Sequence, residues 1–153
     1  SVGTQTGEKD LQAFANAPIA PDVVMLAKCE SAEDVQHAQR VIGKGNTRFI
    51  PLIETLEGLE NAYQIASASE QVEHIMFGGA DMAAELRCEF SYQPLLFVRS
   101  QLVIAAAKAN VGLIDVPYVD AGVVVVNNKM VDRPIILACQ RTLALVKNAS
   151  SNR

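Results

Sequence analysis

The chain of 153 residues is 50% hydrophobic and 20% charged, with a formal net charge of −4. This composition can form a packed core, whereas a nucleic-acid-binding protein would need a basic face and a membrane span would need an apolar run of about 18 residues. The polar opening, residues 1–9, does not resemble a secretory signal. Cys29, Cys88 and Cys139 are too few and too scattered for a disulfide scaffold or a zinc site, so we expect reduced thiols in a cytoplasmic protein.

Strand-like and helix-like segments alternate along most of the chain. Residues 22–29 form the first predicted strand, and the S-A-E-D sequence from Ser31 predicts a capping box with Asp34 at the third position of a helix that runs to about Ile42. The next predicted elements are a strand at 48–53, a helix at 59–67, a strand at 72–77, a helix at 94–110 that begins with Pro94, and a strand at 111–114.

Apolar strands separated by helices are typical of parallel βα units that are covered on both faces, as in a (β/α) barrel or a doubly wound sheet. Four such units make about half a barrel, because a whole barrel takes roughly 250 residues. Residues 123–131 predict a hairpin around Asn127-Asn128, followed by a helix from about Pro134 to Asn148 that Asp132 can cap. We therefore predict a partial barrel at 1–120 and a C-terminal hairpin and helix extension at 121–153.

A carboxylate follows each of the four predicted parallel strands, namely Glu30, Glu54, Asp81 and Asp115. The carboxyl ends of parallel strands meet at one mouth, where several acids repel one another unless a cation neutralises them. Oxygen ligands favour a hard cation such as Mg²⁺, which needs only one or two carboxylates from the protein. The alternative is that these acids cap or favour helix N-termini, as Glu30 could do just before Ser31.

The chain resembles the citrate lyase beta-subunit family of the aldolase–citrate lyase superfamily, which includes malyl-CoA and citramalyl-CoA lyases. The matching stretches are K-C-E-S-A-E-D-V (28–35), L-I-E-T-L-E-G-L (52–59), F-G-G-A-D-M-A-A-E-L (77–86), R-S-Q-L-V-I-A-A (99–106), I-D-V-P-Y-V-D (114–120) and M-V-D-R-P (130–134). Single motifs are moderately specific, whereas six in the same order are a strong signal.

This resemblance implies a (β/α)₈ TIM-type barrel that assembles as homotrimers or hexamers. It places the metal ligands on Glu54 and Asp81, and the catalytic aspartate, which reaches a neighbouring subunit's site, on Asp132. Glu54 and Asp115 are the candidate substrate-binding residues, while Glu30 is interpreted as a support. The family has further barrel strands before the position of Ser1, one of which carries a substrate-binding arginine, and no residue of this sequence matches that arginine. The family also has a lid-like stretch at the position where Asp120 of this sequence runs straight into Ala121.

The implied reaction is a Claisen-type cleavage of a citryl, malyl or citramalyl thioester into a 2-oxo acid and an acetyl-type thioester. Mg²⁺ on Glu54 and Asp81 would act as a Lewis acid, and Asp132 would shuttle the proton of the thioester enolate. The carrier is either coenzyme A or an acyl-carrier protein. Two alternatives stay open, namely a metal-dependent aldolase for 2-keto-3-deoxy acids and a non-catalytic subunit of the same fold. No nucleic-acid or membrane partner is expected.

Overall fold

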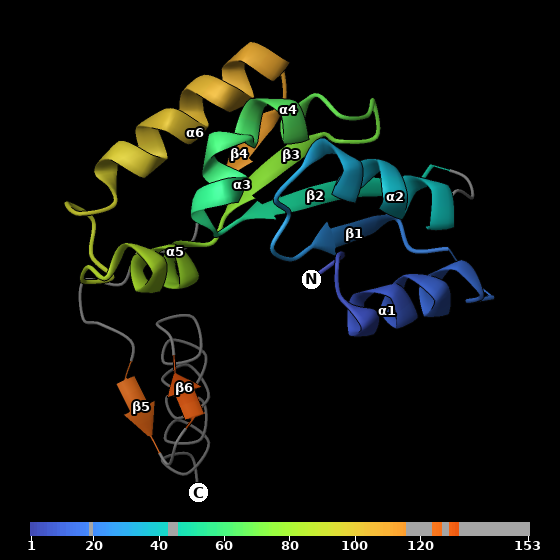
Figure 1. Cartoon of the computed structure of the whole chain (residues 1–153), viewed down its shortest axis with the longest axis horizontal. Coiled ribbons are helices and arrows are strands. Elements are labelled where there is room, and N and C mark those ends of the chain that lie inside the picture. The colour runs from blue at the N-terminus through green and yellow to red at the C-terminus, as the bar shows by residue number, and fades with distance from the viewer. Residues whose placement is uncertain (19, 43–45, 116–123, 127–128, 132–153) are drawn as a thin grey trace, which may run out of the picture. The chain divides into compact units, whose positions relative to one another are not determined.

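A computed structural model of the chain describes residues 1–18, 20–42, 46–115, 124–126 and 129–131. The chain divides into two units, Ser1–Val116 and Pro117–Arg153, and the predicted boundary after residue 120 stays a prediction. The elements of the first unit are α1 (Gln5–Ala15), β1 (Val23–Leu26), α2 (Ala32–Ile42), β2 (Arg48–Ile53), α3 (Leu56–Glu60), α4 (Ala62–Ala66), β3 (His74–Phe77), α5 (Gly79–Leu86), α6 (Leu96–Ala109) and β4 (Gly112–Ile114) (Figure 1). No helix in the described part of the chain is long and apolar enough to cross a membrane.

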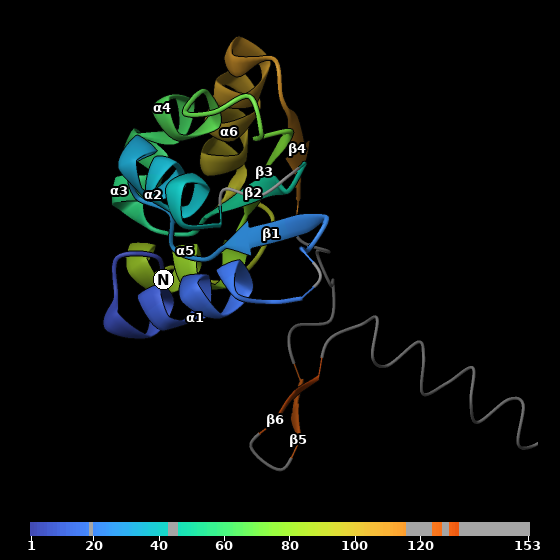
Figure 2. The ribbon, with the colours of Figure 1, turned by 90° about the vertical axis from the view of Figure 1, so that its right-hand side faces the viewer.

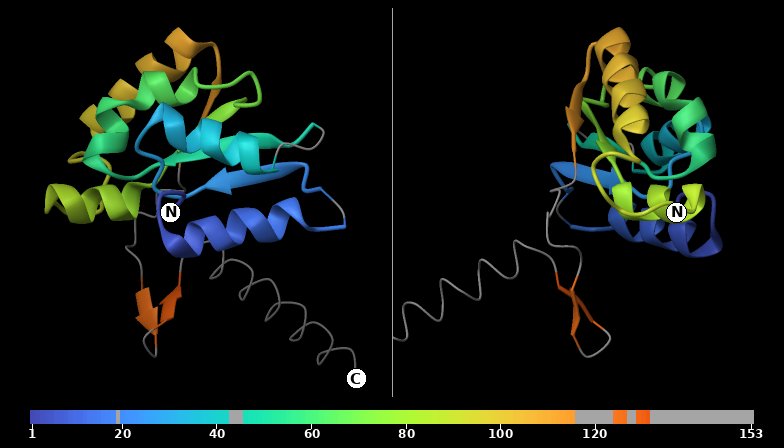
Figure 3. Two further views of the ribbon diagram at one scale, coloured as in Figure 1. Left: turned by 45° about the vertical axis from the view of Figure 1, so that its right-hand side comes forward. Right: turned by 90° about the vertical axis from the view of Figure 1, so that its left-hand side faces the viewer.

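The four strands of this unit form one parallel sheet in the order β1-β2-β3-β4, which confirms the predicted α/β class. Helices α2, α3, α4 and α6 lie on the same side of the sheet (Figures 2 and 3). Val24 and Leu26 of β1 are buried on that side, whereas Val23 and Met25 are 50% and 53% exposed. The expectation of cover on both faces is therefore wrong for the described residues, and helices on a single face are typical of a barrel rather than of a doubly wound sheet.

The start of α2 confirms the predicted capping box. The backbone N–H groups of Glu30 and Ser31 donate to Asp34 Oδ2 at 2.9 and 3.0 Å, and Asp34 N–H donates to Ser31 Oγ at 3.3 Å. These bonds occupy backbone donors that have no partner within the helix. The helix then ends at Ile42, as predicted.

Other boundaries differ from the prediction for local reasons. The helix expected at 59–67 begins earlier, because Thr55 caps α3 by accepting a hydrogen bond from the N–H of Gly58 at 3.1 Å, and it divides at Asn61 into α3 and α4. The strand expected at 22–29 ends at Leu26, two residues before Lys28 adopts a left-handed backbone with φ of 49°. Helices α1 and α5 had no predicted counterpart.

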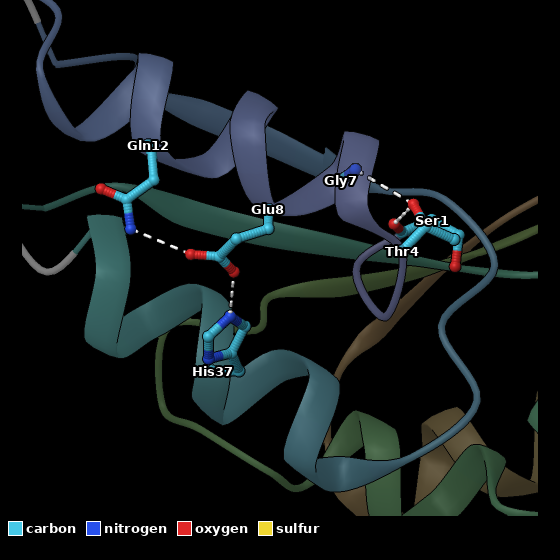
Figure 4. Close-up of polar contacts among 6 residues, drawn as sticks. All are labelled: Ser1, Thr4, Gly7, Glu8, Gln12 and His37. Atoms are coloured by element: carbon cyan, nitrogen blue, oxygen red, sulfur yellow. Dashed lines mark hydrogen bonds and ion pairs between the residues drawn. The ribbon is translucent and has the colours of Figure 1, made fainter.

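Helix α1 is joined to α2 by a polar contact (Figure 4). Glu8 Oε2 lies 2.6 Å from His37 Nε2, and Glu8 Oε1 accepts a hydrogen bond from Gln12 at 2.9 Å. These two contacts, first that with Gln12 and then that with His37, lower the pKa of the Glu8 carboxyl. Because both side chains of the pair are roughly two-fifths exposed, solvent screens the pair and its contribution to stability is small.

The second unit contains the antiparallel pair β5 (Val124–Val126) and β6 (Lys129–Val131). Val124 pairs with Val131 and Val126 pairs with Lys129, which leaves two residues for the turn and confirms the predicted hairpin. Asn127, Asn128 and the helix expected at 134–148 lie outside the described residues.

The capping box predicts unequal effects for two neighbouring carboxylates. Asp34→Ala should lower the free energy of unfolding by about 1 kcal/mol, because it leaves two backbone N–H groups without their acceptor. Glu33→Ala also removes a first-turn carboxylate, but Glu33 is exposed and serves as the matched control. Urea unfolding of the full chain measures both values, and equal losses would mean that only the charge near the helix N-terminus matters.

Candidate metal centre

Glu54 directly follows β2 and is the most buried of the four acids at the strand ends. Only 6% of the residue is exposed, so its carboxylate must find partners within the protein. One partner is the backbone N–H of Lys28, which donates to Glu54 Oε1 at 2.9 Å. The loop after β1 therefore holds the acid that follows β2.

Lys28 provides this bond from an unusual backbone conformation. Its φ of 49° lies in the left-handed region, which residues with a side chain seldom adopt. The next residue, Cys29, donates its backbone N–H to the carbonyl of Leu52 at 3.2 Å. The turn thus directs consecutive amides toward the end of β2, one to its backbone and one to the carboxylate of Glu54.

Gly78 leaves the space that the Glu54 side chain fills. A Cβ atom at position 78 would lie 2.3 Å from Glu54 Cβ and 2.7 Å from Glu54 Oε2. The N–H of Gly78 also donates to the carbonyl of Ile53 at 2.8 Å, which fixes the loop after β3 against the end of β2. The first glycine of the Gly78-Gly79 pair is therefore required by close packing against Glu54, and no phosphate-binding role is needed to explain it.

Asp81 lies in the first turn of α5 and comes close to Glu54. Burial is the main cause that raises the pKa of the Glu54 carboxyl, and the hydrogen bond and negative charge of Asp81 raise it further. The N–H of Lys28 and the charge of its side chain oppose this rise. The structure thus brings together the two acids that the sequence assigned to a metal.

The donor chemistry of this pair fits Mg²⁺. Both groups offer carboxylate oxygens, the ligands that a hard cation selects, and a cation between them would remove the repulsion that raises the pKa of Glu54. Within the described residues no cluster of three or more His, Cys, Asp or Glu side chains could hold a metal. Two carboxylates are nevertheless enough for Mg²⁺, which keeps several positions for water or substrate.

Asp115 directly follows β4, and its carboxylate is engaged by a different partner. Asp115 Oδ2 accepts from Arg99 Nε at 2.9 Å, and the Arg99 side chain is only 9% exposed. The guanidinium carbon of Arg99 lies 5.0 Å from the ring centroid of Phe77 and 5.2 Å from that of Tyr92. An arginine that contacts two aromatic rings thus offsets the charge of Asp115. Its predicted role in substrate binding stays a prediction.

Glu30 takes part in the structure through its backbone. Its N–H donates to Asp34, and its carbonyl accepts from Asn61 Nδ2 at 2.9 Å. No hydrogen bond or ion pair of the Glu30 carboxylate is found in the part of the chain that the structure describes. The interpretation of Glu30 as a support thus rests on its main chain. Asp132 and the junction of Asp120 with Ala121 lie outside the described residues.

Two contributors to this site were missed by the sequence reasoning. No local signal predicts the left-handed backbone of Lys28, because its N–H donates to the carboxylate of Glu54, which is 26 residues away in sequence. Arg99 had a usable signal, because a charged residue within a largely apolar helix needs a partner when its side chain is buried. Asp115, at the end of the next strand, is that partner.

Comparison with known proteins identifies the relatives of the chain. Residues 1–126 match the family model of HpcH/HpaI aldolase/citrate lyase. Citrate lyase subunit beta of Escherichia coli (strain K12) is 32% identical over 132 residues, which are 79% of this chain and 43% of that protein. The structure of RipC from Yersinia pestis has a TM-score of 0.72 and 35% identity, covering 77% of this chain and 55% of that chain. The citrate lyase beta subunit of M. tuberculosis, solved with oxaloacetate and magnesium, has a TM-score of 0.63 and 28% identity, covering 79% of this chain and 53% of that chain.

The chain thus spans less than half the length of the curated relative from E. coli. The match still includes β1 to β4 and both acids of the candidate centre, which lie within residues 1–126. Because the family model covers most of the sequence, the chain belongs to the HpcH/HpaI aldolase/citrate lyase family.

Proposed function

We propose that the chain is part of a Mg²⁺-dependent carbon–carbon lyase that acts on a 3-hydroxy-3-carboxylate thioester of the citryl, malyl or citramalyl type. The observation that carries this proposal is the pairing of Glu54 with Asp81 at the carboxyl ends of neighbouring parallel strands. A structurally similar protein has been solved with magnesium and the 2-oxo acid oxaloacetate, which supports the same ligand chemistry here.

The proposed reaction needs no oxidant or reductant. The substrate hydroxyl loses its proton, its carbon becomes the carbonyl of a 2-oxo acid, and the adjacent carbon–carbon bond breaks. The electron pair of that bond forms a thioester enolate, which takes up a proton and leaves as an acetyl-type thioester. When bound, Mg²⁺ supplies Lewis-acid stabilisation for the charge that develops on the substrate oxygen.

The residues of the chain have separate tasks in this proposal. Glu54 and Asp81 would hold the cation, and the burial of Glu54 keeps bulk water from one side of the site. Asp132 would transfer the proton to or from the enolate carbon, and Asp115 would contribute to substrate binding. The carrier would be coenzyme A or an acyl-carrier protein, and the protein would work as a cytoplasmic homo-oligomer, a trimer or hexamer.

Loss of one carboxylate of the pair should strongly reduce turnover. Asp81→Asn removes a charged ligand but keeps the side-chain shape, so we expect cleavage to fall by about 1,000-fold, since Lewis-acid stabilisation amounts to several kcal/mol. A coupled assay for the released 2-oxo acid, run with Mg²⁺ over malyl, citramalyl and citryl thioesters, measures the loss. Glu30→Gln removes an exposed acid after β1 and is the matched control.

The same assay tests the competing functions. Cleavage of 2-keto-3-deoxy acids together with inactivity toward every thioester would favour the aldolase. If the protein binds Mg²⁺ but cleaves no substrate of either class, the result would favour a non-catalytic subunit of the same fold.

The raised pKa of Glu54 predicts how stability depends on pH without metal. A carboxyl with a higher pKa in the folded state binds its proton more tightly there than in the unfolded chain. The resulting stabilisation is present below the usual carboxyl pKa of about 4.3 and is lost as the pH rises through the raised value. Urea unfolding with a chelator, from about pH 4 to about pH 7, should show this loss. Asp81→Asn should reduce it because the like charge is gone, and an unchanged pH dependence in that variant would contradict the pairing.

Asp132→Asn separates proton transfer from helix capping. Asparagine caps a helix about as well as aspartate, so the variant should fold and bind Mg²⁺, but its amide cannot accept the proton. General acid–base catalysis contributes about 100- to 10,000-fold, and turnover should fall within that range. Near-normal turnover with a normal melting temperature would leave capping as the whole role of Asp132.

A further inference from the structure

Glu85 joins the two segments that carry the acids of the candidate centre. Its Oε2 accepts a hydrogen bond from the backbone N–H of Leu56 at 2.8 Å. Leu56 is the first residue of α3 and follows Glu54 by two positions, while Glu85 lies on α5 one helical turn after Asp81. We propose that Glu85 is a positioning residue that holds Glu54 and Asp81 at a fixed separation for the cation, an inference that rests on the proposed function.

The bond is suited to this task because each of its two residues is close in sequence to one of the acids. Leu56 is two residues from Glu54, and Glu85 is four residues from Asp81. Residues four apart lie on the same face of a helix, so Asp81 and Glu85 both face the segment that follows β2. The bond is charge-assisted, since a carboxylate accepts from an amide at the start of a helix. The link therefore holds α5 to α3 without using the Asp81 carboxylate itself.

The other contacts of this turn leave the N–H of Leu56 to Glu85. Thr55 Oγ1 accepts from Gly58, and the carbonyl of Thr55 accepts from Leu59 at 3.0 Å. The first N–H groups of a helix have no partner within the helix, so Leu56 needs an acceptor from elsewhere. Glu85 is that acceptor in the described structure.

Glu85 supports the centre without acting as a ligand. It forms no group of three potential ligands with Glu54 and Asp81 in the described structure, and one of its oxygens is committed to an amide. Residues that orient metal ligands typically change affinity by about 10- to 100-fold when they are replaced. A similar loss is expected here, because the separation of the two acids would no longer be fixed.

Calorimetric titration of the full chain with Mg²⁺ tests the proposal. Glu85→Ala should raise the Mg²⁺ dissociation constant about tenfold, whereas Glu85→Gln should bind almost as the unmodified chain does, because its amide oxygen can still accept from Leu56. Glu89→Ala removes another exposed acid just after α5 and controls for the loss of charge. If Mg²⁺ binding is weakened equally in the Ala and Gln variants, the role of the hydrogen bond is overturned, and the charge of Glu85 alone would explain the effect.

A second variant removes the same bond from its donor side. Leu56→Pro deletes the N–H at the first position of α3, where proline is well tolerated, and Thr55 already has the extended backbone, φ −125° and ψ 159°, that a following proline needs. The Leu56 side chain is 42% exposed, so little packing is lost. If one bond is responsible, Leu56→Pro should match Glu85→Ala, and the double variant should be no weaker than either single variant.

Two further measurements keep the outcomes distinct. In the metal-free chain the Leu56 amide should exchange its hydrogen about tenfold faster in Glu85→Ala, and an unchanged rate would overturn the contact whether or not Leu56→Pro folds. Asp81→Asn in the same titration tests the metal centre itself. Unchanged Mg²⁺ affinity in Glu85→Ala, with binding lost in Asp81→Asn, would overturn only the positioning role. Absence of Mg²⁺ binding in the unmodified chain would overturn the proposed centre and this inference with it.

Discussion

The burial of one carboxylate, that of Glu54, determines the arrangement around the carboxyl end of the sheet. A buried acid must be hydrogen-bonded, neutralised or protonated, because its transfer from water is otherwise very costly. Lys28 adopts a left-handed backbone and supplies an amide, and Gly78 provides the room. Asp81 acts in the opposite direction, since its approach raises the pKa of Glu54. Two acids that are held together in this way, with only the charge of Lys28 to oppose their repulsion, form a pair that a bound cation would stabilise.

The acids at the strand ends therefore do not form one uniform cluster. The carboxylate of Asp115 is paired with the positively charged side chain of Arg99, which also contacts two aromatic rings. That pairing removes one negative charge from the mouth of the sheet and leaves Glu54 and Asp81 as the two that act on each other. This division is favourable for a Mg²⁺ centre, since a third acid close to the pair would raise the repulsion without being needed as a ligand.

Sequence reasoning succeeded where the structure depends on neighbours along the chain. The capping box of α2 and the bounds of β2 follow from spacing and apolar pattern, and both were predicted correctly. It also placed acids at the strand ends, because parallel order fixes where those ends meet. It could not predict the conformation of Lys28 or the partner of Glu85, since each contact joins residues more than 25 positions apart. Thr55, which sets the start of α3, is the exception, a local cap that the sequence reasoning overlooked.

Strand β1 carries a further indication of the fold class. Val23 and Met25 alternate with Val24 and Leu26 along β1, so both faces of this strand are apolar although only one packs under helices. An edge strand with a solvated face would normally show polar residues on that face. In a barrel, by contrast, the inward side chains of each strand pack against those of the strands across the interior, and both faces must be apolar. A barrel strand is therefore expected to be apolar on both faces although helices cover only one of them, as β1 is. This pattern agrees with the family to which the chain belongs.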